Sequence, residues 1–421
     1  MIKIANLSMN QLKFSNKEKN KMHIGIVGGG AAGLCAAIKA KQLGLEVHLF
    51  DANSSPGRKL NATGSGRCNI SNQKAQAGQY FTDDQDTLQK CFQKFPPAQV
   101  LTFLESIGIP TVSSTDGWIY PLSYSAANVV DILSDNLRDI HMHANTLITH
   151  LEKKNGAFYL HSGDPAQQYH FEKLIITSGS PANPQLGARS VLYDPIAALG
   201  HTILPVRPAL SPIETDTSLF HKLQGVRLDA GITLFHRNKF VTHNIGNIII
   251  TQWGLNGPGV MDISHLIKPE EPEQYQLKIN FAPKFSAELT TVLSKMNNTD
   301  RSIGALLKAY LPAKVVEFIL RQTNLDAALS CSELGKTQME YLLHAIQNQI
   351  LVVRNVRGFK FAQASTGGVP LAEINPDTME SNKCPGLFFA GEILNVLGPC
   401  GGFNLHWAFL SGLIAANGLL D

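Results

Sequence analysis

The chain has 421 residues, of which 44% are hydrophobic and 16% charged, and its formal net charge at neutral pH is only +3. This length predicts two or three domains, and the small net charge does not favour a nucleic-acid-binding surface. We find no apolar run long enough for a membrane span and no signal-peptide pattern. The six cysteines show no C-x-x-C or paired spacing. We therefore expect a cytoplasmic protein with free thiols and no membrane partner.

The first 21 residues are polar and show little periodicity. We expect this segment to be a flexible, loosely held tail. Ordered structure is predicted to begin near Met22, which is also a candidate for an alternative start.

The strongest motif follows directly. An apolar strand at 24–27 leads into glycines at a fixed spacing, Gly28, Gly30 and Gly33. The first glycine allows a tight turn, the second lets the backbone approach a pyrophosphate, and the third lets a helix pack against the strand. The start of that helix offers unpaired N–H groups and a positive dipole end to phosphates. This spacing predicts a dinucleotide-binding turn.

A second strand and an acidic residue complete this motif. An alanine-rich helical run ends near Leu43, and the apolar stretch 45–50 leads to Asp51. An acid at this position accepts hydrogen bonds from the adenosine ribose. Strand, helix, strand and acid all fall in the expected order, so we interpret the segment as a dinucleotide site.

The segment from Ser54 to Asn72 is rich in glycine and polar residues and lacks helical or strand periodicity. A loop of this length in a compact domain is usually functional or disordered. Glycines expose backbone N–H groups, and Arg58, Lys59 and Arg67 add positive charge. This combination suits phosphates or an anionic ring.

The remaining elements alternate in type along the chain. Helical patterns are expected at 84–95, 98–107 and 126–138, and strands at 145–151, 157–160 and 174–177. A β-rich stretch with strands at 230–235, 246–251 and 276–281 precedes a helical block at 286–349 and a strand at 351–356. A short buried strand near 387–390 and a final apolar helix at 405–418 end the chain.

This order predicts an α/β protein. We expect a Rossmann-type dinucleotide-binding domain that is split in sequence, with its first part at 22–201 and its second part at 363–421. Residues 202–362 are expected to form an inserted domain, part β-barrel or sandwich and part helical.

The C-terminal segment favours FAD over NAD as the cofactor. A bound FAD needs a distant strand and helix for its ribityl chain and ring, and Gly391-Glu392 and the helix starting near Gly402 supply them. The N–H groups at that helix start suit the N1–C2=O edge of a reduced flavin. The alternative is a glycine-rich turn that caps a core helix.

No second G-x-G-x-x-G motif follows a strand. We therefore do not expect NAD(P)H to bind stably in a domain of its own. A transiently bound NAD(P)H and another electron donor both remain open as the source of hydride.

Several other side chains have both a functional and a structural interpretation. Cys68 and Cys400 could be redox thiols, but we favour small side chains in tight turns. His141 and His143 would share a strand face and could bind a metal, but no further ligands cluster there in the sequence. We favour a surface strand and predict no metal site.

Candidates for the substrate side are less specific. Arg354 and Arg357 could clamp an anionic substrate or brace a loop. His406, one turn into the final helix, is more typical of a packing histidine than of a residue that reaches the ring. The remaining polar or aromatic candidates are Tyr120, Gln252, Trp253 and Asn256.

Several segments together resemble one family. They are Gly28–Gly33, Gly57-Arg58-Lys59-Leu60, Gly66-Arg67-Cys68-Asn69, Ser365-Thr366-Gly367-Gly368-Val369, Gly391-Glu392 and Gly398–Asn404. From about Met22 to the C-terminus the sequence resembles the BaiN-like (YhiN-like) flavoproteins, which are NAD(P)/FAD-dependent oxidoreductases. The resemblance implies FAD, a split FAD-binding domain, and an inserted barrel-plus-helices domain.

The resemblance also implies a set of cofactor contacts, which we expect in three groups along the FAD molecule. Those at the adenosine and pyrophosphate are Gly28, Gly30, Ala31, Ala32 and Asp51, with Leu147 beside the adenine. Those along the pyrophosphate and flavin are Arg58, Lys59, Arg67, Cys68 and Asn69. Those at the ribityl chain and ring are Gly391, Glu392, Gly402, Phe403 and Asn404.

Two stretches depart from the family pattern. The family's Gly-Asp-Gly after the second buried strand is replaced by the sequence of 179–189, which lacks it. The family's Thr-His-x-Gly-x-Ser-Gly-Pro motif reads Thr251-Gln252-Trp253-Gly254-Leu255-Asn256-Gly257-Pro258 here. A proton-transfer role for that histidine is therefore not available to this chain.

These observations lead to one functional expectation. The chain is expected to be an FAD-dependent oxidoreductase that transfers hydride through flavin N5 to or from a small organic substrate, with NAD(P)H as a candidate transient donor. The alternatives are a flavin-dependent RNA-modifying enzyme and a non-catalytic flavin-binding sensor. The sequence specifies neither the substrate nor the oligomeric state.

Overall fold

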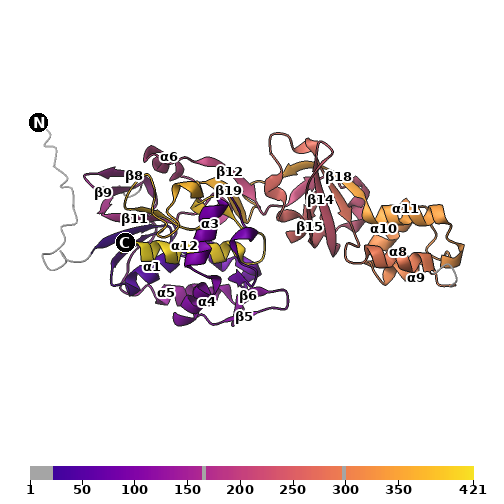
Figure 1. Cartoon of the computed structure of the whole chain (residues 1–421), viewed down its shortest axis with the longest axis horizontal. Helices are drawn as coiled ribbons and strands as arrows, with labels where there is room; N and C mark the ends of the chain where they lie inside the picture. The colour runs from indigo at the N-terminus through magenta and orange to yellow at the C-terminus, as the bar shows by residue number, and fades with distance from the viewer. Residues whose placement is uncertain (1–21, 164–166, 296–299) are drawn as a thin grey trace, which may run out of the picture. The chain divides into compact units, whose positions relative to one another are not determined.

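The computed structural model describes residues 22–163, 167–295 and 300–421 (Figure 1). The expected tail at 1–21 lies outside the described residues. The chain divides into two compact units, one formed by Met1–Val206 with Gly367–Asp421 and the other by Arg207–Thr366. The sequence boundaries expected for the insert are 201/202 and 362/363.

The first unit is built on a parallel sheet of five strands in the order β20-β11-β1-β2-β7. The strands are β1 (His23–Val27), β2 (Glu46–Phe50), β7 (His141–His143), β11 (Lys173–Ile176) and β20 (Leu387–Phe389). The chain runs from β1 through β2 to β7 and then crosses to the other side of β1 for β11 and β20. The strand order therefore reverses between β1 and β11, which is the arrangement of a doubly wound fold. Because β20 comes from the C-terminal segment and pairs with β11, the two sequence segments form one Rossmann-type domain.

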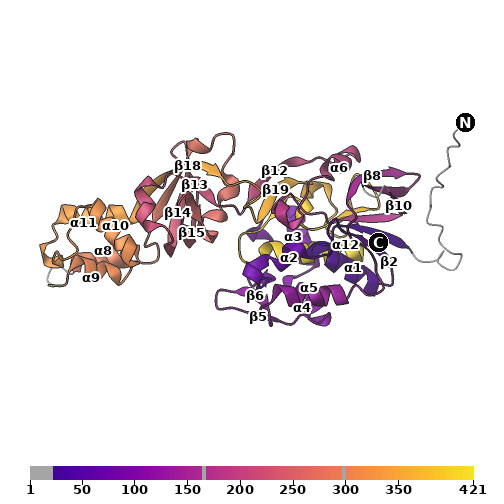
Figure 2. The ribbon, with the colours of Figure 1, turned by 180° about the vertical axis from the view of Figure 1, so that it is seen from behind.

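Two helices and a small sheet pack on this central sheet. Helix α1 (Ala31–Gln42) contacts β2 and lies beside α12 (Phe403–Gly418) (Figures 1 and 2). A three-stranded antiparallel sheet consists of β8 (Ile148–Lys154), β9 (Ala157–Ser162) and β10 (Gln168–Phe171). Its Phe171 ring contacts the rings of His48 and Phe50 on β2.

The other elements of the first unit are short. The helices are α2 (Arg58–Asn61), α3 (Gln85–Lys94), α4 (Pro97–Ser106), α5 (Ala126–Asp135) and α6 (Tyr193–Ala198). The strands are β3 (Ser71–Asn72), β4 (Phe81–Thr82), β5 (Thr111–Ser113), β6 (Trp118–Pro121) and β21 (Val396–Leu397). The helices expected near 84–95, 98–107 and 126–138 are thus confirmed. Asp84 and Ser125 cap two of them by accepting hydrogen bonds from Thr87 N–H and Asn128 N–H.

The second unit contains a closed antiparallel barrel in the order β13-β16-β15-β14-β17-β18. Its strands are β13 (Ile213–Thr215), β14 (Arg227–His236), β15 (Lys239–Ile250), β16 (Gly254–Asn256), β17 (Tyr275–Asn280) and β18 (Gln349–Val356). A short helix, α7 (Pro258–Met261), packs on β15. Of the two alternatives that the sequence left open, barrel or sandwich, the barrel is confirmed.

The helical block of the second unit lies between β17 and β18 in sequence. It comprises α8 (Ser286–Lys295), α9 (Ile303–Lys308), α10 (Ala313–Gln322) and α11 (Lys336–Gln347). Figure 1 shows these four helices together in orange beyond the barrel strands. Strands β12 (Leu204–Ala209) and β19 (Ala364–Gly368), which pair with each other, carry the chain out of the first unit and back.

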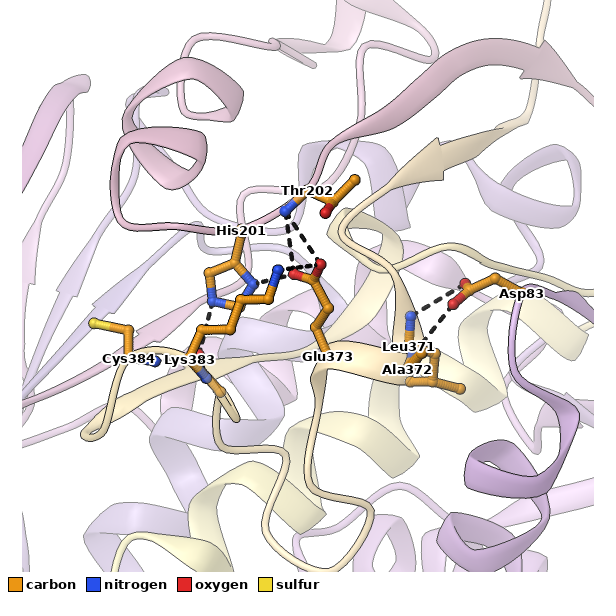
Figure 3. A network of polar contacts seen from close by, with 9 residues as sticks. Asp83, His201, Thr202, Leu371, Ala372, Glu373, Lys383 and Cys384 are labelled. Carbon is orange, nitrogen blue, oxygen red and sulfur yellow. Dashed lines mark hydrogen bonds and ion pairs between the residues drawn. The ribbon is translucent and has the colours of Figure 1, made fainter.

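A polar network joins the segment after α6 to the returning C-terminal segment (Figure 3). His201 Nδ1 lies 2.8 Å from Glu373 Oε2, and Lys383 Nζ donates to Glu373 Oε1 at 2.5 Å. Burial alone would raise the pKa of Glu373, but the hydrogen bonds from Lys383, Thr202 and His201 together lower it. Nearby, the Asp83 carboxylate accepts hydrogen bonds from the N–H groups of Leu371 and Ala372. These contacts fasten together parts of the domain that are far apart in sequence.

Helix α12 is buried on most of its surface, which is typical of a core helix. It approaches α1 closely at one point, where a Cβ on Gly412 would lie 2.5 Å from the carbonyl oxygen of Ala32. Only glycine allows this separation without moving a helix.

His406 is enclosed on the same helix. Its Nδ1 forms a 2.8 Å hydrogen bond with Ser71 Oγ, while Nε2 has no hydrogen-bond partner among the described residues. Burial lowers the pKa of His406 to about 4. The ring is therefore neutral at physiological pH.

Among the residues that the structure describes, we find no helix with the length and apolar character needed to span a membrane.

We expect Gly412→Ala to destabilise the first unit. The added methyl group would collide with the Ala32 backbone, at a cost of about 1–3 kcal/mol that the better helix propensity of alanine only partly offsets. The measurement is guanidinium unfolding followed by the fluorescence of released flavin. Gly78→Ala is the matched control, since its Cβ would meet no atom within 4 Å. Equal stability of the two variants would contradict the close helix contact.

We also expect stability to fall as the pH is lowered from 6.5 towards 4. In this range the His406 ring gains a proton in the unfolded chain but not in the folded one, so that up to about 3 kcal/mol is lost progressively. His406→Gln should flatten this part of the pH dependence of thermal unfolding. An unchanged slope in His406→Gln would refute the assignment.

Candidate functional site

The glycine-rich turn lies at the carboxyl end of β1, between β1 and α1. Gly28 has a φ of +114°, and a Cβ there would lie 2.4 Å from the carbonyl oxygen of Thr177. A Cβ on Gly33 would lie 1.8 Å from the Gly28 carbonyl oxygen. The Thr177 hydroxyl donates to the carbonyl oxygens of Val27 and Gly28. Protein contacts alone therefore require glycine at positions 28 and 33.

Gly30 differs from both neighbours in what surrounds it. A Cβ there would meet no atom within 4 Å, and its backbone is extended, so packing of the described residues does not demand glycine. The first turn of α1 has neither an acidic residue nor a capping side chain. Its N–H groups, which include those of Ala31 and Ala32, have no partner within the helix. This open space beside a helix N-terminus fits a pyrophosphate.

Asp51 lies at the end of β2 and is 8% exposed. Its Oδ2 accepts a hydrogen bond from Gly29 N–H at 2.8 Å, and its Oδ1 accepts one from Asn53 N–H at 2.7 Å. Burial raises the pKa of Asp51, although these hydrogen bonds oppose the shift. The carboxylate thus holds the glycine turn. Oδ1 also accepts a 2.9 Å hydrogen bond from the Asn53 side-chain amide, so Oδ2 is the oxygen that keeps capacity for a ribose hydroxyl. Leu147 is half-buried and follows Thr146, whose N–H donates to the Asp51 carbonyl oxygen.

The basic residues of the long loop differ in their surroundings. Arg58 is exposed and donates to Asn53 Oδ1 at 3.0 Å. Lys59 forms a 2.6 Å ion pair with Glu392. Arg67 is exposed, with its guanidinium 5.7 Å from the centre of the Tyr120 ring.

The turn at 63–68 has a strained backbone. Ser65 and Cys68 have φ values of 55° and 58°, in the left-handed region that non-glycine residues rarely adopt. Such strain tends to cluster at functional sites. Burial raises the pKa of the Cys68 thiol to about 11, so the unreactive thiol form predominates. This favours the structural interpretation of Cys68 over the redox one.

Glu392 is the centre of a polar cluster. One carboxylate oxygen pairs with Lys59, and the other accepts a 2.8 Å hydrogen bond from Ser180 Oγ. The Tyr193 hydroxyl is buried and has no hydrogen-bond partner among the described residues. Burial and the charge of Glu392 raise the pKa of Tyr193, which keeps it protonated. Four separate segments of the first unit contribute to this cluster.

The N-terminus of α12 is held by its own loop. Gly402 has a φ of +95°, and a Cβ there would lie 2.3 Å from the Ser71 carbonyl oxygen. The Asn69 amide, in the orientation that satisfies its neighbours, donates to Ser71 O and Ile119 O and accepts from Gly402 N–H. Asn404 accepts from Gly398 N–H and donates to Gly398 O. Both asparagine side chains therefore brace the glycine-rich loop.

Phe403 is fixed at the same helix start. Its carbonyl oxygen accepts a 2.9 Å hydrogen bond from the hydroxyl of Tyr80. Gly391, the residue before Glu392, has a φ of +78°, and a Cβ there would lie 2.9 Å from the Ala32 Cβ. The early glycine turn and the C-terminal motif thus approach each other at α1.

All the predicted cofactor residues lie in the first unit. Most substrate-side candidates lie in the second unit and have local partners there. The Arg357 guanidinium lies 4.4 Å from the centre of the Trp253 ring, and Arg357 Nε lies 3.5 Å from Glu214. Arg354 pairs with Asp216 at 3.2 Å. These contacts favour loop bracing for both arginines.

Three residues of the site escaped the sequence analysis. Thr177 and Ser180 follow β11, next to the glycine turn, and their position after a buried strand is a signal that could have identified them. Tyr193 lies in a short helix with no motif around it.

Comparisons with known proteins agree with this geometry. Residues 22–418 match the family model described as "HI0933-like protein Rossmann domain". A 3-dehydro-bile acid delta(4,6)-reductase of Clostridium scindens is 32% identical over 93% of this chain and 97% of that protein. Ribosomal RNA dihydrouridine synthases of Escherichia coli and Haemophilus influenzae are 29% and 26% identical, over 94% and 93% of this chain and 97% and 96% of theirs.

A solved structure shares the fold at low identity. The 3-ketosteroid delta1-dehydrogenase of Sterolibacterium denitrificans is 11% identical, with a TM-score of 0.51 over 94% of this chain and 99% of that chain. The family resemblance stated from the motifs is confirmed: the chain belongs to the HI0933-like family, the BaiN/YhiN flavoproteins, and is an FAD-dependent oxidoreductase.

Proposed function

We propose that this enzyme reduces a carbon–carbon double bond in a small organic substrate, by hydride transfer from flavin N5. The names of two relatives support hydride transfer from the flavin to the substrate, because "delta(4,6)-reductase" and "dihydrouridine synthase" both describe the addition of hydrogen to a double bond. When bound, FAD supplies the two-electron carrier. The observation that carries the proposal is the open space beside Gly30 at the N-terminus of α1.

The proposed FAD contacts fall into two groups. The residues assigned to the adenosine and pyrophosphate end are Gly28, Gly30, Ala31, Ala32, Gly33, Asp51 and Leu147. The residues assigned to the rest of the cofactor are Arg58, Lys59, Arg67, Cys68, Gly391, Glu392, Gly402 and Phe403. Asn69 and Asn404 act indirectly in this proposal, because their side-chain amides already hold the loop around Gly402.

The cluster around Glu392 provides the polar groups of the proposed site. Lys59 and Ser180 hold the two carboxylate oxygens, so the Glu392 side chain is fixed before any ligand binds. Tyr193 retains its proton and can donate a hydrogen bond from Oη. A buried hydroxyl without a partner among the described residues has most to gain from a bound acceptor.

The proposed electron donor is NADH or NADPH that binds transiently at the flavin. The support is the lack of a second dinucleotide fingerprint in the sequence, which leaves no separate domain for stable binding.

A second candidate function is RNA modification by the same flavin chemistry. Two relatives are named as ribosomal RNA dihydrouridine synthases. In the second unit, Lys222, Lys314 and Arg321 line one pocket, together with His221 and the acidic Glu317. A local concentration of basic side chains is the type of surface that contacts phosphates.

We expect Gly30→Val to yield folded but colourless protein. The new side chain would fill the space proposed for the pyrophosphate without touching the protein, so FAD binding should be lost and the fold kept. The measurement is the flavin absorbance per chain after gel filtration, with circular dichroism as the test of folding. Gly78→Val is the control, and it should remain yellow. Stoichiometric FAD in Gly30→Val would refute the placement.

A second prediction concerns the reaction. Anaerobic mixing with NADH or NADPH should bleach the flavin, and an α,β-unsaturated 3-ketosteroid should restore its colour with saturation of the double bond. Restoration by unmodified ribosomal RNA alone, with RNA affinity that falls steeply with salt, would select the second candidate. Absence of bleaching by either nicotinamide would contradict the proposed donor. Bleaching without reoxidation by either substrate would contradict both proposed reactions.

A further inference from the structure

Four histidines and a glutamate gather on one face of the central sheet, at the edge formed by β1, β2 and β7. In the sheet register His23 pairs with Glu46, and His48 pairs with His141. Residues two apart on a strand share a face, so all these side chains project from the same side of the sheet. His143 follows on the same face, opposite Phe50.

The ligand atoms lie at distances that suit one metal ion. His23, Glu46 and His48 each place a nitrogen or oxygen within 4.8 Å of the others. Glu46 Oε1 lies 3.4 Å from His23 Nδ1 and 3.3 Å from His141 Nε2. Two ligands of a tetrahedral zinc ion, each at about 2.0–2.1 Å, lie roughly 3.3–3.4 Å apart.

His48 provides a second, independent observation. The residue is 6% exposed, and its Nε2 has no hydrogen-bond partner among the described residues. Its other ring nitrogen, Nδ1, forms a 3.0 Å hydrogen bond with His143 Nε2. If Nδ1 carries the proton, Nε2 presents a lone pair for a metal. Metal-bound histidines usually have their second nitrogen held in this way.

We propose that His23, Glu46 and His48 bind a divalent transition-metal ion, with zinc the best match to this set of ligands. Imidazoles with one carboxylate are a typical zinc donor set. The ion would join the adjacent strands β1 and β2. His143 would be a positioning residue, because it contacts His48 rather than the metal. This proposal departs from the prediction of no metal site, but it does not make His141 or His143 a ligand.

The proposed site is separate from the flavin site. His23 and Glu46 begin β1 and β2, whereas the glycine turn follows the end of β1. The four residue steps from His23 to Val27 span roughly 13 Å of strand. The metal is therefore structural in this proposal, and the inference does not depend on which substrate the flavin reduces.

The test uses the full-length FAD-bound protein, freed of metal with a chelator and titrated with zinc against a chromogenic competitor. We expect one zinc ion per chain and a higher thermal unfolding midpoint with zinc, since the ion binds only the folded state. Glu46→Gln and His23→Gln should each weaken zinc binding at least tenfold. His143→Phe keeps an aromatic ring beside Phe50 but removes the hydrogen bond to His48. It should weaken binding by about 10–100-fold.

The matched control is His161→Ala, which removes a histidine 3.7 Å from Glu152 in the same unit. Zinc affinity in this variant should equal that of the parent. FAD content reports folding in every variant, since none of these side chains belongs to the proposed flavin site. Failure of the parent to bind one equivalent of zinc would overturn the proposal. So would zinc affinity in Glu46→Gln and His23→Gln equal to that of the parent.

Discussion

The close approach of the first and last helices at Ala32 is the constraint on which the rest of the site depends. Gly412 lets the Ala32 carbonyl oxygen come within van der Waals range of α12, and Gly391 meets the Ala32 Cβ from the other side. Both contacts would be lost with larger side chains at these two glycines. Because α1 begins directly after the glycine turn and α12 begins directly after the Gly402 loop, this crossing also fixes the position of one helix N-terminus relative to the other. A cofactor that contacts both therefore finds its two binding regions already in place.

The two sequence segments of the first unit are held together by more than the contact between α1 and α12. Strand β20 supplies backbone hydrogen bonds to β11, and the network of Figure 3 supplies charged ones. The side chain of Asn395 extends that network, since it donates to Asp83 and accepts from Gly367 N–H, the first residue of the returning segment. Buried ionic groups are weak evidence for net stability, because their desolvation offsets much of their attraction. These ionic groups favour one docking register of the returning segment, because any other register leaves each charged group without its partner.

The sequence predicted the parts of this structure that depend on local patterns. The βαβ fingerprint, the three early helices and the barrel-plus-helices insert each have a periodicity or spacing that a single segment displays. The sequence did not predict which group each side chain contacts. The expected contacts of Asn69 and Asn404 with the flavin stay a prediction. The amides of both residues hold backbone groups of one loop, which depends on the path of that loop. The same holds for the His48 neighbours: β7 follows β2 by some 90 residues of chain, and only the sheet order places them side by side.

The polarity of a parallel sheet explains why two sites can coexist in one small domain. Loops at the carboxyl ends of the strands converge at the point where the strand order reverses, and ligands bind there. The amino ends of the strands form no such crevice, so side chains that cluster there contribute to folding rather than to catalysis. Strand β7 has only three residues and lies at the edge of the sheet, where few backbone hydrogen bonds hold it. Ring stacking of His143 on Phe50 and of His141 on His48 also holds this strand in place. In the proposed metal site, a bound cation would contact His48 Nε2, a buried nitrogen that has no hydrogen-bond partner among the described residues.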